Sequence, residues 1–519
     1  MEKHEINQKQ GQVWLVGAGP GDAGLLTLRG RQLLQEADVV VYDHLAGAAV
    51  LGMIPPGTRC LCVGKRAGRH SVPQEEINRL LVEEARAGHK VVRLKGGDPF
   101  LFGRGAEEMQ QLLEAGIPCQ VVPGVSSALA VPAYAGIPVT HRDWASLVHI
   151  ITGHSKKDGL PAMDWDALAR LKGTLVFLMG VGHMEEICAQ LQTHGKAAST
   201  PAAILQEGTT SRQRTVIATL ETLPQQARAA GIQAPAIIVV GEVCRLGEEL
   251  SWVEQRPLHR LRVLVTRPQE RASRLSEPLR RLGAEVVEFP AIATRPLPPE
   301  ELAPVLSQLG DYTWLGFTSP AGVEGFFDLL ARQRMDVRTL SGKKLAVIGP
   351  GTAQALEKRG LFADCMPEEY TARALGKTLA RTVLPGEKVL LPRAREGSPE
   401  LPACLKQAGI PYRDWPLYDT LPAGSEAAPV RRLLEEGGVD LLTFTSASCV
   451  RRFAQAMDGL DLSGCTAVCI GEQTAQAARA LGLRCLVAPQ ATMDAMVQTI
   501  LEYANHTITP QNEEDLSWK

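Results

Sequence analysis

The chain has 519 residues, and its 55 Lys and Arg against 57 Asp and Glu give a formal net charge of −2 at pH 7. A chain of this length is too long to fold around one ordinary hydrophobic core, so we predict two to four domains. A hydrophobic fraction of 45% and a charged fraction of 22% exclude a disordered chain. Because the net charge is close to zero, no global field favours nucleic acid or a membrane surface, and anionic ligands need local basic clusters.

The eleven cysteines form no framework of disulfide or metal-ligand spacing. Cys60 and Cys62, and likewise Cys465 and Cys469, stand close together, but neither pair has a second pair nearby. We therefore expect reduced thiols and no metal site. Residues 1–12 are polar and charged, unlike a secretory signal, and no apolar run reaches the roughly 18 residues that span a bilayer. We expect a cytoplasmic protein.

In the first half, short β-rich runs alternate with helical patterns, which predicts α/β layers with largely parallel sheets. In chain order the runs are 13–16, 38–42, 90–94, 119–123, 174–178 and 236–240. Glycine and proline near residues 135–138 divide this region, residues 12–245, into two lobes. Residues 246–259 lose the periodicity and become charged, so we predict an interdomain linker there.

The second half, residues 260–503, contains an internal repeat. Phe317-Thr318-Ser319 returns as Phe444-Thr445-Ser446, and Ile348-Gly349 returns as Ile470-Gly471 at nearly the same offset. A third match joins residues 371–375 with 491–496. Three ordered matches predict two similar lobes.

Two proline-rich segments, 289–299 and 415–422, bracket the first copy of the repeat. Proline disfavours helix, and the residue before each proline is biased towards extended backbone. If the two segments pair as a two-stranded connector, residues 297–414 form one lobe, and residues 260–289 with 423–503 form the other. A hinge and a cleft between the lobes would follow. Residues 504–519 are predicted to be a polar tail.

A glycine-rich turn follows the first predicted strand. Gly19, Gly21 and Gly24 satisfy the G-x-G-x-x-G pattern of a dinucleotide-binding turn. However, Pro20 removes one backbone N–H that would hold a pyrophosphate, and Asp22 adds negative charge where a phosphate would approach. Taken alone, the turn is weak evidence for a nicotinamide-dependent dehydrogenase, which remains the enzymatic alternative.

Two further loops follow predicted strands. In Gly96-Gly97-Asp98 the glycines let a ligand touch the backbone, and Asp98 can accept hydrogen bonds from hydroxyls or an amine. Ser126-Ser127 place hydroxyl groups at a helix start. Both loops have structural alternatives, because Asp98 and Ser126 are also good helix caps.

Seven segments then occur in one order: VGAGPGDAGLLT, ADVVVYDHL, VGKRAG, RLKGGDPFLFGRG, VPGVSSALAVPAYAGIPVTHR, FLMG and EGTTSRQR. This series resembles the uroporphyrinogen-III C-methyltransferases of the tetrapyrrole methylase family. The resemblance implies S-adenosylmethionine, which has no pyrophosphate, as methyl donor, so Pro20 and Asp22 are no longer anomalous. It implies cofactor contacts at Pro20, Gly96, Gly97, Asp98, Leu101, Ser126, Ser127, Met179 and Gly208.

The resemblance also implies that Asp43 and Lys65 act as proton acceptor and proton donor. Methylation of a pyrrole carbon leaves a cationic intermediate whose proton must be redistributed. The alternatives are a capping role for Asp43 and, for Lys65, binding of a substrate carboxylate. Four more basic residues beside the motifs are candidates for the eight substrate carboxylates: Arg66, Arg69, His70 and Arg142.

Residues 260–503 resemble uroporphyrinogen-III synthase, through VTRP, FTS, the IG…TA turns, the repeat and Tyr418 within PLYDT. That enzyme cyclises linear hydroxymethylbilane, with loss of water and inversion of the last ring. By resemblance Tyr418 assists departure of the hydroxyl, and its alternative is a packed connector tyrosine. Thr352 and Thr474 lie at helix starts, where carboxylates bind well. Ser319 and Ser446 can do the same, although helix capping also explains all four residues.

Together these features predict a fused enzyme that cyclises hydroxymethylbilane to uroporphyrinogen III and methylates it twice to precorrin-2, for sirohaem or cobalamin. We expect small tetrapyrroles as its partners and a homodimer formed through the methyltransferase half, with no nucleic acid and no membrane. Two alternatives concern the second half, which is either a ligand-binding sensor or a tetrapyrrole-binding module without catalysis.

Overall fold

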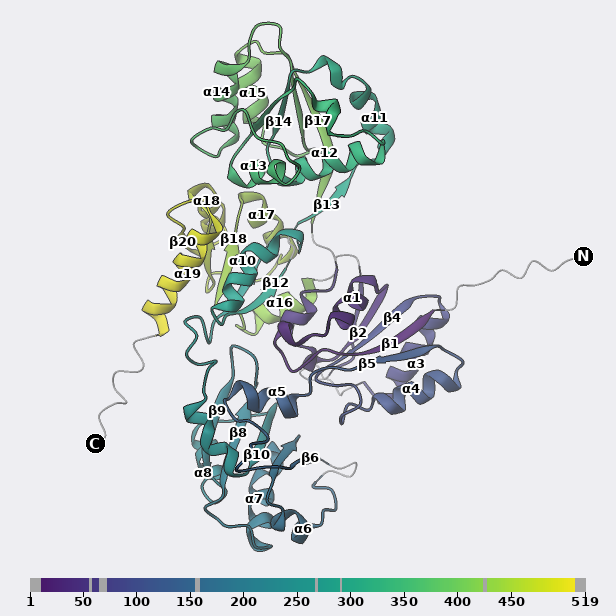
Figure 1. Ribbon diagram of the computed structural model, residues 1–519, viewed down its shortest axis with the longest axis vertical. Helices are drawn as coiled ribbons and strands as arrows, with labels where there is room; N and C mark the ends of the chain where they lie inside the picture. Colours follow the sequence, from purple (N-terminus) through teal and green to yellow (C-terminus); the bar gives the residue numbers. More distant parts are fainter. Residues whose placement is uncertain are drawn as a thin grey trace, which may run out of the picture. The chain divides into compact units, whose positions relative to one another are not determined.

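Figure 1 shows the computed structural model of the chain, which describes residues 11–55, 58–64, 72–154, 159–266, 269–289, 292–422 and 427–508. These residues fall into two compact units, Met1–Ala291 with Ala423–Lys519 and Ile292–Pro422. The described strands form four five-stranded sheets, three in the first unit and one in the second. Helices alternate with the strands, which confirms the α/β class.

The first sheet is parallel throughout, in the order β3-β2-β4-β1-β5. Side chains alternate along β1, so that Val13 and Leu15 pack on one face while Trp14 and Val16 pack on the other. Its strands are β1 (Gln12–Gly17), β2 (Val39–Tyr42), β3 (Arg59–Cys62), β4 (Lys90–Lys95) and β5 (Cys119–Val122), and its helices are α1 (Leu28–Glu36), α2 (Ala48–Leu51), α3 (Gln74–Arg86) and α4 (Gly105–Glu114).

The second sheet has the order β6-β7-β10-β8-β9, and only the β6–β7 pairing is parallel. The expectation of largely parallel sheets is wrong here, because β8 and β9 are joined by a short loop that only antiparallel strands allow. Its elements are β6 (Val148–Thr152), β7 (Thr174–Leu178), β8 (Pro201–Gln206), β9 (Arg214–Thr219), β10 (Ala236–Val240), α5 (Ser127–Tyr134), α6 (Trp165–Arg170), α7 (Met184–Thr193) and α8 (Leu223–Ala229).

The third sheet, β12-β11-β18-β19-β20, is parallel and joins strands from both sides of residues 292–422. Leu275 and Leu279 of α10 share a core with Met496 and Ile500 of α19. Its elements are β11 (Arg262–Val265), β12 (Glu285–Glu288), β18 (Leu441–Phe444), β19 (Thr466–Cys469), β20 (Arg484–Val487), α10 (Gln269–Arg281), α16 (Ala427–Glu435), α17 (Ala447–Ala456), α18 (Glu472–Arg479) and α19 (Met493–Ile508). Helix α19 thus continues past residue 503, where we expected the tail to begin.

The second unit contains the fourth sheet, β13-β17-β16-β14-β15. The predicted pairing of the two proline-rich segments is confirmed, because β13 runs antiparallel to β17 with Ile292 opposite Pro422. The other pairings are parallel. Its elements are β13 (Ile292–Pro296), β14 (Trp314–Phe317), β15 (Lys344–Val347), β16 (Val389–Ala394), β17 (Tyr412–Pro422), α11 (Pro299–Ser307), α12 (Pro320–Arg332), α13 (Pro350–Glu357), α14 (Ala372–Thr382) and α15 (Glu400–Gln407).

The two copies of the repeat adopt the same local structure. Ser319 follows β14 and caps α12 by accepting a hydrogen bond from the Gly322 N–H at 3.0 Å. Ser446 follows β18 and caps α17 in the same way, through the Cys449 N–H at 3.2 Å. The sequence repeat therefore corresponds to a repeated strand–turn–helix unit.

The predicted linker is ordered and packed, and it contains one short helix, α9 (Leu246–Glu249). The Trp252 indole donates to the Ala133 carbonyl at 2.9 Å, and the Arg256 guanidinium lies 4.3 Å from the centre of the Trp252 ring. Further along, the Leu258 N–H donates to the Leu282 carbonyl at 2.9 Å. Residues 246–259 thus contact the second sheet's lobe at one end and the third sheet's lobe at the other.

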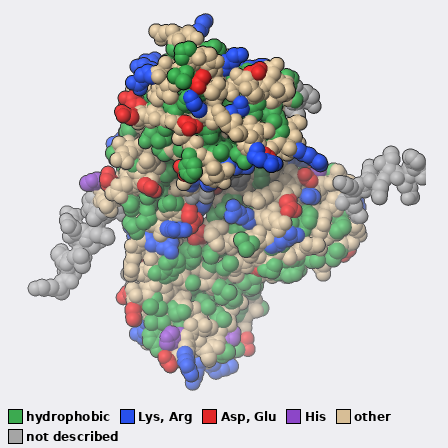
Figure 2. Space-filling model, turned by 45° about the horizontal axis from the view of Figure 1, so that its top comes forward, with side chains coloured by type: hydrophobic (Ala, Val, Ile, Leu, Met, Phe, Trp, Pro, Cys, Tyr) green, Lys and Arg blue, Asp and Glu red, His purple; other side chains and the backbone are tan. Residues whose placement is uncertain are grey.

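Basic, acidic and hydrophobic side chains are intermingled on the face shown in Figure 2. Among the described residues no helix is long and apolar enough to cross a membrane. The eleven cysteines are free thiols.

We predict that Phe326→Ala destabilises the second unit by roughly 3–5 kcal/mol, because Phe326 is fully buried against Phe317, Phe327 and Trp415. Hydrogen exchange of peptides from residues 292–422 in increasing urea measures this loss. The matched control is Phe362→Ala, which removes a ring that is 75% exposed and should change stability by less than about 0.5 kcal/mol. Equal losses in the two variants would contradict this assignment of the core.

Candidate functional site

A cavity of about 550 Å³ lies in the first unit, between loops of the first sheet and loops of the second. This volume is typical of small-molecule sites. Its lining is mainly apolar side chains and backbone, and it includes Leu45, Val131, Leu178, Leu205 and Ile237.

The first wall is built by the loops after β1 and β4. The Gly97 N–H donates to the Gly19 carbonyl at 2.8 Å, and the Gly19 N–H donates to the Gly97 carbonyl at 3.2 Å. These bonds bring Pro20 beside Gly96 and Gly97, all three of which line the cavity. A Cβ at Gly96 would lie 2.5 Å from the Leu45 Cβ, so no side chain fits at this position.

The second wall is built by loops at the strand ends of the second sheet. Met179 follows β7, and Glu207 and Gly208 follow β8. Met179 and Glu207 have φ values of 57° and 45°, in the left-handed region that non-glycine residues rarely adopt. Such backbone strain concentrates at functional sites.

Six of the nine predicted cofactor residues line this one cavity: Pro20, Gly96, Gly97, Ser127, Met179 and Gly208. They come from four loops and the start of α5, spread over residues 20–208, and the fold brings them together.

The other three predicted cofactor residues, Asp98, Leu101 and Ser126, hold the surrounding loops. The Asp98 carboxylate accepts hydrogen bonds from the N–H groups of Phe100, Leu101 and Gly124 at 2.8, 3.1 and 3.0 Å. Ser126 caps α5 through the Ala128 N–H, and Leu101 packs against a core that includes Val131. The capping alternative is therefore present for Ser126, whereas Asp98 holds a turn and the helix that follows, α4, has Arg104 at its N-cap.

Asp43 stands at the end of β2, close to the lining residue Leu45. One carboxylate oxygen accepts from the Leu45 N–H at 3.1 Å, and the other lies 3.4 Å from Arg93 Nη2. Arg93 Nε lies 3.3 Å from Oε1 of the buried Glu108, beside Lys95. The pKa of Lys95 is lowered, first by burial and then by the Arg93 charge. The position of the Asp43 carboxylate is thus set by a buried ionic network.

None of the basic residues predicted to bind substrate carboxylates is found at the cavity in the described part of the chain. Lys65, Arg66, Arg69 and His70 lie outside the described residues. Arg142 is described and exposed, and it is not among the lining residues of the cavity.

Sequence reasoning missed several lining residues, notably Glu207, Val131 and His154. Glu207 was within reach, because it precedes Gly208 in the EGTTSRQR segment. His154 belongs to no motif, and it lines the cavity because β6 pairs in parallel with β7, which brings it to the same edge as Met179.

In the second unit Tyr418 lies on β17, only 8% exposed, within a core shared with Phe317 and Trp415. Its hydroxyl lies 3.0 Å from the Ser319 Oγ, in hydrogen-bond contact. Two features singled out in the sequence, the FTS turn and the PLYDT tyrosine, therefore meet at the carboxyl end of β14, the edge where parallel sheets bind ligands.

Comparison with known proteins assigns the two halves to two families. Residues 12–224 match the Tetrapyrrole (Corrin/Porphyrin) Methylases, and residues 273–498 match Uroporphyrinogen-III synthase HemD. The porphyrin biosynthesis protein HemD of Ruminiclostridium josui is 44% identical over 501 residues, which cover 96% of this chain and 99% of that protein.

Two further proteins are similar to parts of the chain. The uroporphyrinogen-III C-methyltransferase of Bacillus subtilis is 44% identical over 366 residues, 70% of this chain and 75% of that protein. Among solved structures, the uroporphyrin-III C-methyl transferase of Thermus thermophilus, complexed with S-adenyl homocysteine, is 43% identical. It covers 45% of this chain and 99% of its own, with a TM-score of 0.39.

The two family models follow each other in the predicted order, and the Ruminiclostridium relative matches across both. The chain belongs to the family of porphyrin biosynthesis proteins in which a tetrapyrrole methylase domain is fused to a uroporphyrinogen-III synthase domain.

Proposed function

We propose that the chain cyclises hydroxymethylbilane to uroporphyrinogen III and methylates that product twice, with S-adenosylmethionine, to precorrin-2. The observation that carries the methyltransferase assignment is the single cavity that collects six predicted cofactor residues. The fusion supports the sequence of reactions, since one domain makes the substrate of the other. The proposed boundaries are 12–245 for the methyltransferase, 246–259 for the linker and 260–503 for the synthase.

The lining of the cavity fits a sulfonium cofactor better than a dinucleotide. Among its described lining residues none is Lys or Arg, and Glu207 supplies a carboxylate. A pyrophosphate would need cationic groups or free N–H donors, and Pro20 has no N–H. A cationic sulfonium needs neither. These features argue against the nicotinamide alternative.

Bound S-adenosylmethionine supplies an electrophilic methyl group on a cationic sulfur. Pro20, Gly96, Gly97, Ser127, Met179 and Gly208 would hold it. The electron-rich pyrrole needs little activation, so the main task of the cavity is to orient the two reactants. In the proposed role, Asp43 accepts the proton that leaves the methylated ring, and Arg93 orients its carboxylate.

In the synthase half we propose that Tyr418 assists departure of the bilane hydroxyl. The Ser319 hydroxyl orients the phenol through their 3.0 Å contact, and Ser319 is itself positioned by capping α12. Because bilane closes spontaneously to the uninverted isomer, the lobes must mainly fold and steer the chain.

A homodimer formed through the methyltransferase half is also proposed, in the cytoplasm. The large hydrophobic side chains exposed on this half supply apolar surface, and they include Phe100, Phe102, Leu129, Trp144 and Leu147. Light scattering on the purified chain should give about twice its mass of 56.0 kDa. A monomeric mass at micromolar concentration would contradict the dimer.

Asp43→Asn should lower the rate of methylation roughly 100- to 10,000-fold, because the amide cannot accept the proton. Its affinity for S-adenosylhomocysteine, measured by calorimetry, should stay unchanged. Mass spectrometry of products from hydroxymethylbilane and S-adenosylmethionine measures the effect, and the rate of uroporphyrinogen III formation without S-adenosylmethionine is the internal control. Binding of NAD with none of S-adenosylhomocysteine would refute the methyltransferase assignment.

Tyr418→Phe should slow formation of uroporphyrinogen III roughly 10- to 100-fold and raise the share of the uninverted isomer, because the phenol hydroxyl is lost. Isomer separation by chromatography measures both effects. Tyr412→Phe, on the same strand β17, is the matched control and should keep the normal rate. If the unsubstituted chain yields only the uninverted isomer at the spontaneous rate, the second half is a binding module.

A further inference from the structure

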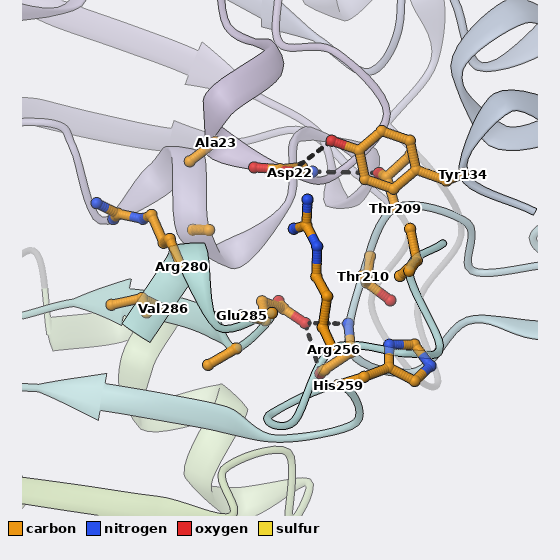
Figure 3. Close-up of a pocket in the computed structure, with 15 residues that line it drawn as sticks. Asp22, Ala23, Tyr134, Thr209, Thr210, Arg256, His259, Arg280, Glu285 and Val286 are labelled. Atoms are coloured by element: carbon orange, nitrogen blue, oxygen red, sulfur yellow. Dashed lines mark hydrogen bonds between the residues drawn. The ribbon is translucent and has the colours of Figure 1, made fainter. Parts of the chain in front are cut away.

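The loop between β8 and β9, residues 207–213, faces the cofactor cavity on one side and the third sheet on the other. Glu207 and Gly208 line the cavity. Ser211 donates two hydrogen bonds to Glu285 Oε2, from its N–H at 2.9 Å and from its Oγ–H at 2.7 Å, as the dashed lines at Glu285 show in Figure 3. Glu285 is the first residue of β12, in the synthase half of the chain.

A second carboxylate holds the same loop. Arg212 Nη2 lies 2.9 Å from Asp440 Oδ1, and Asp440 precedes β18. The two carboxylates are linked through Arg262 on β11, whose Nε is 2.8 Å from Glu285 Oε1 and whose N–H donates to Asp440 Oδ2 at 2.6 Å. One arginine therefore positions both acceptors of the loop.

The Ser211–Glu285 contact is buried enough to matter energetically. The Glu285 side chain is 8% exposed, and Ser211 is buried. Short hydrogen bonds to an ionised carboxylate are stronger than neutral ones, and salt screens them little when they are buried. Removing one partner leaves a buried polar group unsatisfied.

The loop needs such support because its backbone is strained. Glu207 and Thr209 have φ values of 45° and 68°, which persist only when surrounding contacts hold them. On its inner side the Thr209 hydroxyl accepts from the Asp22 N–H at 3.2 Å, and the Tyr134 hydroxyl donates to Asp22 at 2.7 Å (Figure 3). The loop thus connects the glycine-rich turn that carries Pro20 with Glu285.

The contact uses the edge of the third sheet that is opposite to its ligand-binding edge. Arg262, Glu285 and Asp440 lie at the amino ends of β11, β12 and β18. The FTS and IG turns of this lobe follow the carboxyl ends of β18 and β19, where parallel sheets bind ligands. A change at Glu285 can therefore reach the methyl-donor cavity without touching those turns.

We propose that Glu285, together with Asp440, is a positioning residue of the methyltransferase: the synthase half holds residues 207–213 in the conformation that binds the methyl donor. This inference rests on the proposed function of the cavity. It makes the cofactor affinity of one domain depend on two carboxylates of the other.

The test is calorimetric titration of the full chain with S-adenosylhomocysteine. Glu285→Ala should raise the dissociation constant about tenfold, within the roughly 5- to 150-fold range typical of coupled sites. The KM for S-adenosylmethionine should rise similarly, while kcat of methylation and the cyclisation rate stay within about twofold. Glu277→Ala is the matched control, since Glu277 pairs with Arg281 on the exposed surface of α10 and its loss should change neither quantity.

Ser211→Ala is the second variant, because it removes one donor and leaves the Glu285–Arg262 pair intact. It should weaken binding less than Glu285→Ala, and the double variant should bind about as weakly as Glu285→Ala alone. If Glu285→Ala does not fold, the affinity of Ser211→Ala for S-adenosylhomocysteine tests the inference.

Unchanged affinity in the folded variants, or an equal loss in Glu277→Ala, would overturn the inference while the proposed function stands. Failure of the unsubstituted chain to bind S-adenosylhomocysteine would overturn both.

Discussion

The reciprocal hydrogen bonds between Gly19 and Gly97 are the constraint on which the candidate cofactor cavity depends. They join the loops after two neighbouring parallel strands, β1 and β4, into one surface. That contact places Pro20 beside Gly97 at the edge of the cavity, while Leu45 leaves no space for a side chain at the neighbouring Gly96. The glycines serve a backbone-to-backbone contact first, and the ligand surface is its consequence.

This explains why the sequence predicted a glycine-rich turn correctly, while the G-x-G-x-x-G pattern pointed to the wrong ligand, a dinucleotide. A pattern of three glycines indicates that the backbone passes close to another group, but it does not identify that group as a ligand or as other backbone. Pro20 and Asp22 carried the discriminating information, because they conflict with a pyrophosphate. The repeat could also be predicted from the sequence, because Ser319 and Ser446 cap helices after equivalent strands and capping is a local interaction.

Other parts of the site were beyond sequence reasoning because they depend on pairing between distant strands. His154 reaches the cavity through the parallel β6–β7 pairing, and the other pairings of the second sheet are antiparallel, unlike the expected parallel order. Asp98 illustrates a different limit, since a carboxylate after a strand can bind a ligand or cap a turn. Here three backbone N–H groups occupy it.

The packing of the linker between the two halves could not be predicted from its composition. Residues 246–259 are charged and aperiodic, yet Trp252 and Leu258 are tied by hydrogen bonds to the lobes at its two ends. A linker packed in this way limits relative motion of the second and third sheets, and so permits buried contacts such as that between Ser211 and Glu285. In the proposed coupling, binding of the methyl donor and the contact of residues 207–213 with β12 favour each other by the same free energy, because coupling free energies are reciprocal. This contact lies at the amino-terminal strand edge of the third sheet, and the FTS and IG turns lie at its carboxyl-terminal edge.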